Sequence, residues 1–371
     1  MTYFRPKALV RAISLSIVLV GSIAFVGCGR GGKMIGKDYV YVSAPQVNLR
    51  DRLSAVYTKV GTVKNGERVQ ILEKSKRFYR VRTNSGAEGW IEVRYLVPQD
   101  IFDGFEKLRG DNANAVPQAH GAARADLNIH LTPERNGEHL YQMKEGEKVE
   151  VLKRAITEKE STAPPKTIKS ATLKDTSQKE PEAPPKVYED WLLIKDTQQH
   201  VGWVLARMVD IDVPFDIAQY AEGQRIVATF PLNYVQDNDP ATGQTKSVPQ
   251  YLMLTTEPKD GLPYDFNHIR VFSWNQKRHR YETAYRERDL FGVFPVTVAH
   301  EVFDKEGDLP TFTITLKEVS GNSIQRKYKM NGPIVRRVMS PAEEQADKAD
   351  RAQRAAQRRA ERVERRKSKS H

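Results

Sequence analysis

The chain has 371 residues, a mean hydropathy of −0.60 and a formal net charge of +12 at pH 7. This length has room for two or three small domains. The single cysteine excludes a disulfide bond within the chain and a zinc site built from several thiolates.

An export signal is predicted at the start of the chain. Arg5, Lys7 and Arg11 precede the stretch 12–27, which is apolar apart from serines, and Cys28 follows. This apolar stretch is too short to favour a membrane-spanning helix. The segment resembles the lipobox signals of bacterial lipoproteins, in which the cysteine is diacylated and becomes the mature N-terminus. Phe25 departs from the Leu, Val or Ile usual in that motif.

The resemblance implies a signal peptide at 1–27, lipidation of Cys28 and a lipid tether at 28–38. The alternative is an uncleaved N-terminal anchor with a buried cysteine. In both cases we expect the rest of the chain to be exported. The lipoprotein interpretation predicts a periplasmic or extracytoplasmic protein of the cell envelope that its lipid holds to a membrane. Gly29 replaces the aspartate that retains some lipoproteins at the inner membrane, which slightly favours the outer membrane.

The basic charge favours anionic partners in the envelope. Without the three basic residues of the signal, the charge is about +9. Lipid headgroups and wall polymers are anionic partners of an exported chain, so we expect no nucleic-acid partner.

A repeat organises the next part of the chain. The spacing from Asn48 to Gly66 recurs from Asn128 to Gly146, and each copy later carries a Gly-Trp pair. The offset between copies grows from 80 to 113 residues, so 33 residues are inserted in the second copy. Alternating apolar and polar residues with glycine turns predict about five short strands per copy, and therefore a small barrel.

These motifs resemble the bacterial SH3 domain, with its Leu-Asn-Val-Arg-like opening, Trp-x-x-Val strand and Gly-Trp-Val close. We expect SH3-like domains at 39–98 and 123–212, joined by a linker at 99–122. The segment 154–187 is rich in proline and charge and is predicted to be a disordered insertion. The second copy departs from the pattern at His130, where the opening arginine is expected.

The resemblance implies binding without catalysis, to peptidoglycan, to its peptide bridges or to an envelope protein. The ligand groove is expected beside the loop after the first strand, where aromatic rings offer contact area to sugars and short peptides. Its candidates are Tyr57, Phe78 and Tyr79 in the first copy, and Tyr141 and Trp191 in the second. The alternative is that these rings cover the barrel edge. Trp90 and Trp203 of the Gly-Trp pairs are expected in the barrel cores.

The region 213–338 resembles no family that we can name. About seven strands and their turns predict a β-sandwich or an open barrel, so the chain as a whole is expected to be mainly β. The strand-like runs lie at 226–230, 250–256, 269–274, 281–285, 294–299, 311–316 and 324–330.

Basic and aromatic residues alternate in this region. Arg270, Arg278, Arg280 and Arg286 lie among Phe272, Trp274, Tyr281 and Tyr285. One interpretation is a surface that binds an anionic glycan or a phosphate-rich polymer. The alternative is a hairpin whose polar face is solvated.

No catalytic motif is found. The eight histidines show no zinc-peptidase spacing, and the sequence has neither a Gly-x-Ser-x-Gly elbow nor a Walker loop. We therefore expect no catalytic residue, metal site or cofactor, and the prediction is an envelope adaptor rather than an enzyme. The alternative is a cell-wall hydrolase, or its targeting subunit, with an unrecognised catalytic domain at 213–338.

A charged helix is predicted at 340–371. Ser340 is a candidate N-cap, Pro341 suits the first helical position, and Glu343 completes a capping box. Strong helix formers follow, with acids early and bases late. The helix is expected to be exposed, either as a contact for anionic polymers or lipids or as a solubilising tail.

Overall fold

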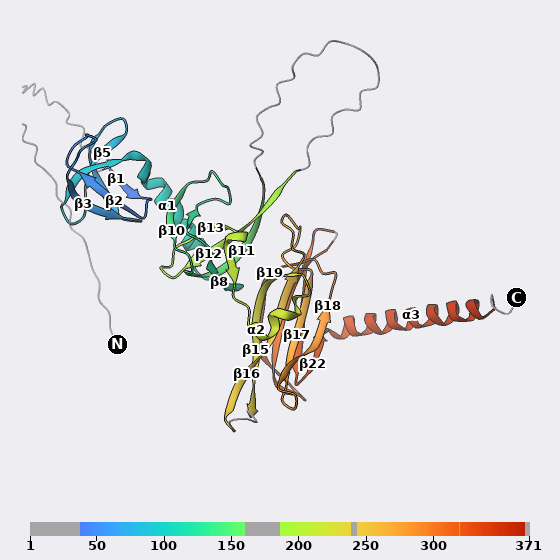
Figure 1. The fold of residues 1–371 in the computed structure, drawn as a ribbon. Coiled ribbons are helices and arrows are strands. Elements are labelled where there is room, and N and C mark those ends of the chain that lie inside the picture. Colours follow the sequence, from blue (N-terminus) through green and yellow to red (C-terminus); the bar gives the residue numbers. More distant parts are fainter. Residues whose placement is uncertain (1–37, 160–185, 239–242, 319, 368–371) are drawn as a thin grey trace, which may run out of the picture. The chain divides into compact units, whose positions relative to one another are not determined.

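The computed structural model describes residues 38–159, 186–238, 243–318 and 320–367 (Figure 1). The predicted signal peptide, Cys28 and most of the insertion lie outside the described residues. The described part contains two small β units, a pair of four-stranded sheets and a terminal helix, which confirms a mainly β fold.

The first β unit, called module 1, spans residues 39–98. Its strands form one antiparallel sheet in the order β3-β2-β6-β5-β4-β1-β7. Alternate side chains point inward, so Leu49, Val63, Val81 and Ile91 form a buried core. The elements are β1 (Tyr39–Val42), β2 (Gln46–Arg50), β3 (Lys59–Lys64), β4 (Arg68–Lys74), β5 (Phe78–Arg82), β6 (Glu88–Glu92), η1 (Val93–Tyr95) and β7 (Leu96–Pro98).

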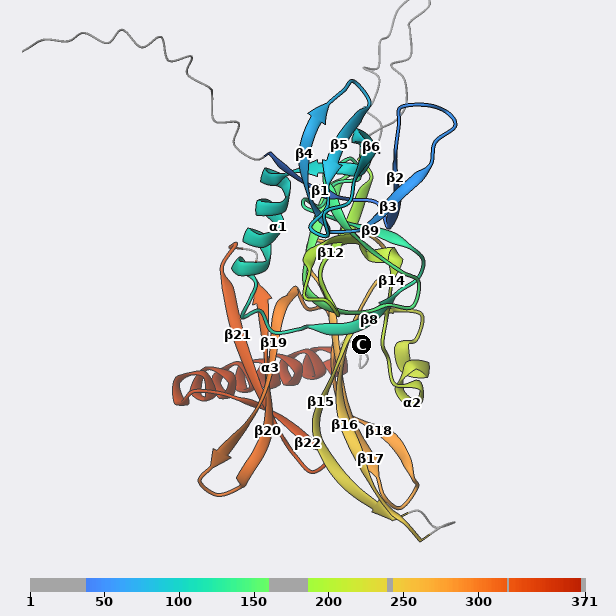
Figure 2. The same ribbon diagram turned by 90° about the vertical axis from the view of Figure 1, so that its left-hand side faces the viewer.

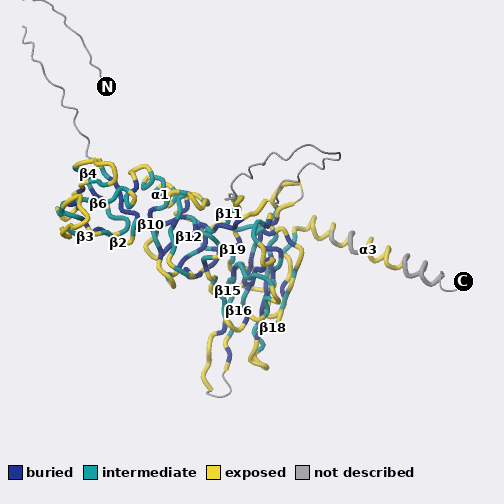
Figure 3. The backbone as a smooth tube through the Cα atoms, turned by 45° about the horizontal axis from the view of Figure 1, so that its top comes forward, coloured by how far each residue is buried: buried dark blue, intermediate teal, exposed yellow. Residues whose placement is uncertain are grey.

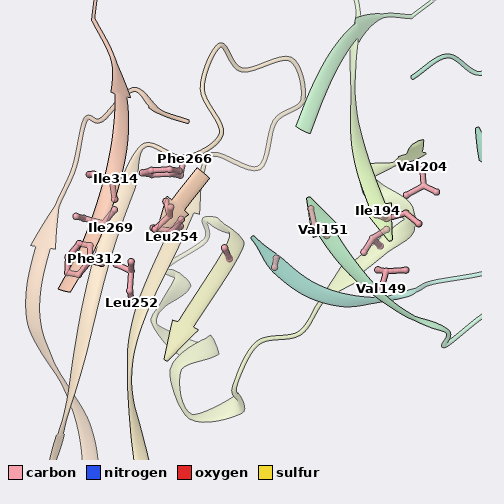
Figure 4. Packing of buried hydrophobic residues seen from close by; sticks show 14 of the residues in the cluster. Val149, Val151, Ile194, Val204, Leu252, Leu254, Phe266, Ile269, Phe312 and Ile314 are labelled. Atoms are coloured by element: carbon pink, nitrogen blue, oxygen red, sulfur yellow. The ribbon is translucent and has the colours of Figure 1, made fainter. Parts of the chain in front are cut away.

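The second β unit, called module 2, spans residues 119–211. Its strand order, β10-β9-β13-β12-β11-β8-β14, reproduces that of module 1 strand for strand. Figure 4 shows Val149, Val151, Ile194 and Val204 in its core. The elements are β8 (Ala119–Ala123), β9 (Leu127–His130), β10 (His139–Met143), β11 (Lys148–Glu158), β12 (Tyr188–Asp196), β13 (Val201–Leu205), η2 (Ala206–Met208) and β14 (Val209–Ile211).

The predicted linker 99–122 needs a correction, because it contains two regular elements. Helix α1 (Gln99–Asp111) fills its first half, and β8 already belongs to module 2. The helix contacts both modules (Figure 2). Phe102 stacks on Tyr41 of module 1, with ring centroids 4.0 Å apart. Phe105 meets Tyr141 of module 2 edge-on at 5.3 Å.

The predicted insertion 154–187 also needs a correction at its ends. Strand β11 continues to Glu158 and pairs with β12 along this length. The last pair of residues is Glu158 and Tyr188. Arg154 is held there by buried ion pairs, which make this part of the hairpin ordered. Residues 160–185 lie outside the described residues.

The third domain, residues 213–338, consists of two antiparallel sheets with the orders β15-β16-β17-β18 and β19-β20-β21-β22. Their apolar faces meet: Figure 4 shows Leu252, Leu254 and Ile269 together with Phe312 and Ile314. The strands are β15 (Arg225–Asn238), β16 (Thr245–Thr256), β17 (His268–Asn275), β18 (Arg280–Glu287), β19 (Gly292–Phe303), β20 (Gly307–Lys317), β21 (Ser323–Asn331) and β22 (Ile334–Val338).

Three short elements of the third domain were not predicted from the sequence. Strand β22 is short and carries two arginines, so it lacks a strong apolar signal. The short helices α2 (Phe215–Ala218) and η3 (Gln219–Ala221) contribute to a cluster on the outer face of the first sheet. Ile217 is fully buried there, against Met253 and Phe272.

Helix α3 (Pro341–Lys367) begins with the predicted capping box. The backbone N–H of Glu343 donates to Ser340 Oγ at 3.3 Å, and the backbone N–H of Ser340 donates to Glu343 Oε2 at 2.9 Å. Those of its residues whose side chains are described are exposed (Figure 3). Among the described residues, no helix is long and apolar enough to span a bilayer.

Candidate ligand-binding site

Arg50 is the centre of an aromatic cluster on the outer face of module 1. It ends strand β2, opposite Trp90 of β6, with its side chain pointing away from the buried Leu49. The Arg50 guanidinium lies 4.4 Å from the ring centroid of Tyr57 and 5.1 Å from that of Phe78. These distances are those of cation–π contacts.

The loop that follows β2 brings Tyr57 to this cluster. Asp51 and Thr58 close the loop, because the Asp51 N–H donates to the Thr58 carbonyl and the Thr58 N–H donates to Asp51 Oδ1 at 2.8 Å. Hydrogen bonds from Arg52 and Thr58 lower the pKa of Asp51. Tyr57 is 37% exposed, and Val56 in the same loop is 83% exposed.

Glu92 adds a carboxylate to the cluster. Arg50 Nη2 donates to Glu92 Oε1 at 2.9 Å, and Arg94 pairs with Glu92 Oε2 at 2.8 Å. A partly exposed cation, a carboxylate and two ring faces therefore lie side by side. Such a surface can accept a ligand carboxylate on Arg50, a ligand amine or amide on Glu92, and a sugar or aliphatic group on the rings.

The structure separates Tyr79 from the other two candidates of module 1. Successive residues of a strand point to opposite faces. Phe78 faces Arg50, whereas Tyr79 packs against the core formed by Val40, Val42 and their neighbours. Tyr57 and Phe78 therefore belong to one surface, and Tyr79 supports the barrel beneath it.

Arg50 and Glu92 were missed by the sequence prediction, which considered aromatic residues alone. A signal was available, since the second copy departs from the first at the Arg50 position, where it has His130. His130 is the counterpart of Arg50 in the repeat, and Trp191 is the counterpart of Phe78. The contact between Arg50 and Phe78 in module 1 therefore corresponds to the contact between His130 and Trp191 in module 2. The His130 and Trp191 rings meet edge-on at 5.5 Å.

The module 2 candidates are both buried. Trp191 is 1% exposed and Tyr141 is 6% exposed, so neither ring forms part of an open surface. Tyr141 stacks on His200 at 3.6 Å, and burial raises the pKa of Tyr141 to about 12. Burial also lowers the pKa of His130.

The outer face of module 2 is covered from within the chain. Leu152, Leu193 and Val201 form a buried cluster there, packed against Trp203. Leu108 of α1 and Ala115, which follows the helix, lie on this cluster. Leu193 and Trp203 correspond to Arg80 and Trp90 of module 1, so this internal contact covers a part of the outer face next to the His130–Trp191 pair.

The two Gly-Trp pairs have the same geometric cause. A Cβ on Gly89 would lie 2.8 Å from Leu49 Cβ, and one on Gly202 would lie 2.3 Å from Ile129 Cγ2. Leu49 and Ile129 are equivalent positions of the repeat, so glycine lets the neighbouring strand approach at this point. The following tryptophans point outward and are half-buried, not in the barrel cores as expected.

The predicted basic surface of the third domain is paired with carboxylates. Arg270 and Arg286 both bind Glu222, at 2.8 and 2.6 Å. Arg278 and Arg280 both lie within ion-pair distance of Glu282. The hydrogen bonds from Arg270 and Arg286 lower the pKa of Glu222 to about 2, and the bond from Arg270 has the larger effect. This pairing favours the solvated-face interpretation over a polymer site.

Within the described ranges, no group of three or more His, Cys, Asp or Glu residues is arranged to hold a metal ion. The candidate site of module 1 is therefore described by its cation, its carboxylate and its rings.

A family model named bacterial SH3 domain matches residues 45–97. Module 1 is a bacterial SH3 domain. A second family model, the GW (Gly-Tryp) dipeptide domain, matches residues 138–210 in module 2. Both kinds of domain are associated with the cell wall and with extracytoplasmic proteins. No curated protein matches the chain.

Among solved structures, an NlpC/P60 family protein from Bacillus cereus is 8% identical, with a TM-score of 0.22. The alignment covers 82% of this chain and 95% of that one. NlpC2 from Trichomonas vaginalis is 9% identical, with a TM-score of 0.15 and coverages of 68% and 98%. Likeness at this level supports no conclusion about activity.

Proposed function

We propose that this chain is an envelope lipoprotein that holds cell-wall peptide or glycan on module 1 and catalyses no reaction. The observation that carries the proposal is the Arg50 guanidinium held on the Tyr57 and Phe78 rings beside Glu92. Stem peptides of the wall offer carboxylates and amines, and its glycan offers sugar faces, which match these groups.

Cys28, which lies outside the described residues, and helix α3 complete the proposal. Cys28 carries the lipid that attaches the chain to a membrane, with the outer membrane favoured where there are two. Helix α3 supplies a charged, exposed segment on the same chain. Lipid and module 1 then act together, because attachment at one point raises the effective concentration at the other.

Co-sedimentation with purified sacculi tests the binding site. The chain lacking residues 1–28 is compared with its Arg50→Ala and Phe78→Ala variants. We expect each substitution to weaken binding about tenfold, because central aromatic and arginine residues dominate such interfaces. If both variants bind sacculi with wild-type affinity, the outer face of module 1 is not the binding site.

Arg68 offers a matched control on the same module. Its guanidinium lies 4.2 Å from the Tyr39 ring centroid, so Arg68→Ala also removes one charge and one cation–π contact. It lies on β4, outside the cluster around Arg50. We expect Arg68→Ala to bind sacculi as the wild type does.

The hydrolase alternative is tested with the same sacculi. Incubation with the purified chain is followed by chromatography of the soluble fraction. We expect no released muropeptides. Release that grows with time and protein concentration would instead make the chain a wall hydrolase.

A further inference from the structure

Helix α3 carries a dense set of basic residues that neither module uses. From Arg351 to Lys367, eight residues are basic and two are acidic, which gives this stretch a net charge of +6. Among the side chains that the structure describes, the helix forms one ion pair, between Glu343 in its first turn and Arg337. The basic stretch follows later in the helix, beyond this contact.

The arginines of this stretch lie on one face of the helix. An α-helix turns by about 100° per residue, so each position can be assigned to a direction around the axis. Between residues 351 and 366, an arc of about 140° contains eight positions, of which seven are arginine and one is Ala355. We call this arc the arginine face; its arginines are Arg351, Arg354, Arg358, Arg359, Arg362, Arg365 and Arg366.

The opposite side of the same stretch carries no basic residue. Its eight positions are three alanines, two glutamines, two glutamates and Val363. Both glutamates, Glu361 and Glu364, therefore lie outside the arginine face. The positive charge is directed to one side of the helix and is not spread evenly around it.

The arginine face is available to a partner. Arg354, Arg358 and Arg359 are the members whose side chains the structure describes, and all three are exposed (Figure 3). The capping box of Ser340 and Glu343 fixes the start of the helix. Arginine, alanine, glutamine and glutamate are strong helix formers, so the helix holds its arginines in place without an apolar core.

The width of the arginine face indicates the shape of its partner. The face is about 22 Å long and covers more than a third of the helix circumference. A flat anionic surface can contact all seven arginines at once, whereas a single polymer strand follows one narrow row. Guanidinium groups also match phosphate oxygens with paired hydrogen bonds. A flat layer of phosphate groups therefore fits this face.

The helix has no apolar side for insertion into a membrane. Val363 is the only apolar residue larger than alanine from residue 342 to 367. Helices that insert into the bilayer interface present residues such as Trp, Phe or Leu opposite their charges. A contact of α3 with a bilayer is therefore electrostatic and stays at the level of the headgroups.

We propose that the arginine face of α3 binds the phosphate headgroups of an anionic phospholipid bilayer. The choice of a bilayer rests on the membrane attachment proposed for Cys28, because that attachment keeps the chain beside such a surface. Each arginine near an anionic leaflet adds to the attraction. The chain then has two membrane contacts, a lipid near one end and an electrostatic contact at the other.

Co-sedimentation with phospholipid vesicles tests the contact without the lipid. The chain lacking residues 1–28 is mixed with vesicles of phosphatidylcholine, or of phosphatidylcholine with about 30% phosphatidylglycerol. We expect binding to the anionic vesicles at least tenfold tighter than to the neutral ones. Raising the salt concentration from about 0.1 M to about 0.5 M should weaken it at least tenfold, since salt screens exposed charges.

A triple variant removes charge from the arginine face. Arg354→Gln, Arg358→Gln and Arg362→Gln together lower the net charge by three and keep good helix formers. We expect this variant to bind anionic vesicles at least tenfold more weakly than the wild type, because three of the seven arginines no longer attract the surface.

A second triple variant is the matched control. Gln353→Glu, Ala356→Glu and Ala360→Glu also lower the net charge by three, but on the opposite side of the helix. We expect its affinity for anionic vesicles to stay within threefold of wild type. Equal losses in the two variants would show that net charge, and not the arginine face, governs binding.

Two further results would overturn the proposal. One is the absence of binding to anionic vesicles. The other is tighter binding to soluble linear polyphosphate than to anionic vesicles at equal phosphate concentration, which would make a polymer strand the partner. Sedimentation with sacculi depends on module 1, and acylation depends on Cys28. Either can therefore succeed when vesicle binding fails, so a failure of this proposal is distinct from a failure of the function proposed above.

Discussion

At the scale of single residues, one position distinguishes the two modules. Arg50 and His130 occupy equivalent places at the end of equivalent strands, and each contacts an equivalent ring, Phe78 or Trp191. In module 1 the Arg50 side chain is a quarter exposed beside a carboxylate. In module 2 burial lowers the pKa of His130, which disfavours its cationic form. The proposed binding position of module 1 and a packing position of module 2 thus occupy equivalent places in the two sheets.

Gly89→Ala tests the close approach at the Gly-Trp pair. The added Cβ would lie 2.7 Å from Val60 Cγ2 and 2.8 Å from Leu49 Cβ, so the barrel must shift. We expect a loss of about 1–3 kcal/mol in the free energy of unfolding, measured by urea denaturation. Gly110→Ala in α1 is the control, because its Cβ would meet nothing within 4 Å. Equal stability of the two variants would contradict the steric explanation.

At the scale of elements, the Glu222 turn links the short helices to the sheet. Glu222 has a left-handed backbone with φ of 54°, and its carboxylate binds Arg270 and Arg286 on neighbouring strands. Arg270 also donates to the Tyr220 carbonyl at 3.0 Å. The turn is therefore held onto the outer face of β17 and β18 by charge.

Glu222→Gln is expected to lower the melting temperature at pH 7. The folded-state pKa of Glu222, about 2, lies below its ordinary value of 4.5, so the ion pairs stabilise the fold above pH 4.5. That contribution is lost as the pH falls from about 4.5 towards 2. The difference between wild type and variant should shrink over this range in thermal melts. A difference independent of pH would show that the ion pairs do not cause it; exposed Glu344→Gln serves as control.

The elements that the sequence predicts well are those with a local signal. Periodicity located about five of the seven strands of each module and seven strands of the third domain, and the capping box located the start of α3. Helix α1 was predicted only as part of the linker 99–122, because its stability comes from Phe102 and Phe105 packing on the two modules. The cluster around Arg50 depends on which face of β5 points outward, and aromatic content alone does not report that.

At the scale of the whole molecule, the membrane attachment that we propose depends on Cys28. We expect wild-type chain expressed in a lipoprotein-processing bacterium to incorporate labelled palmitate and to fractionate with membranes. Cys28→Ser should lose the label and most of the membrane association, because the thiol is the acylation site and each buried CH₂ contributes about 0.8 kcal/mol. Unchanged labelling in Cys28→Ser would contradict lipidation at this residue.

Under the function proposed above, the burial of the module 2 rings sets the number of wall ligands that a chain can hold. Tyr141 and Trp191 are both buried, so these two rings do not form a second open surface in module 2. A soluble wall fragment should therefore titrate at one equivalent per chain despite the duplicated fold. Multivalent binding to the wall must then come from many chains on one membrane. The avidity of that binding should therefore increase with the surface density of the protein.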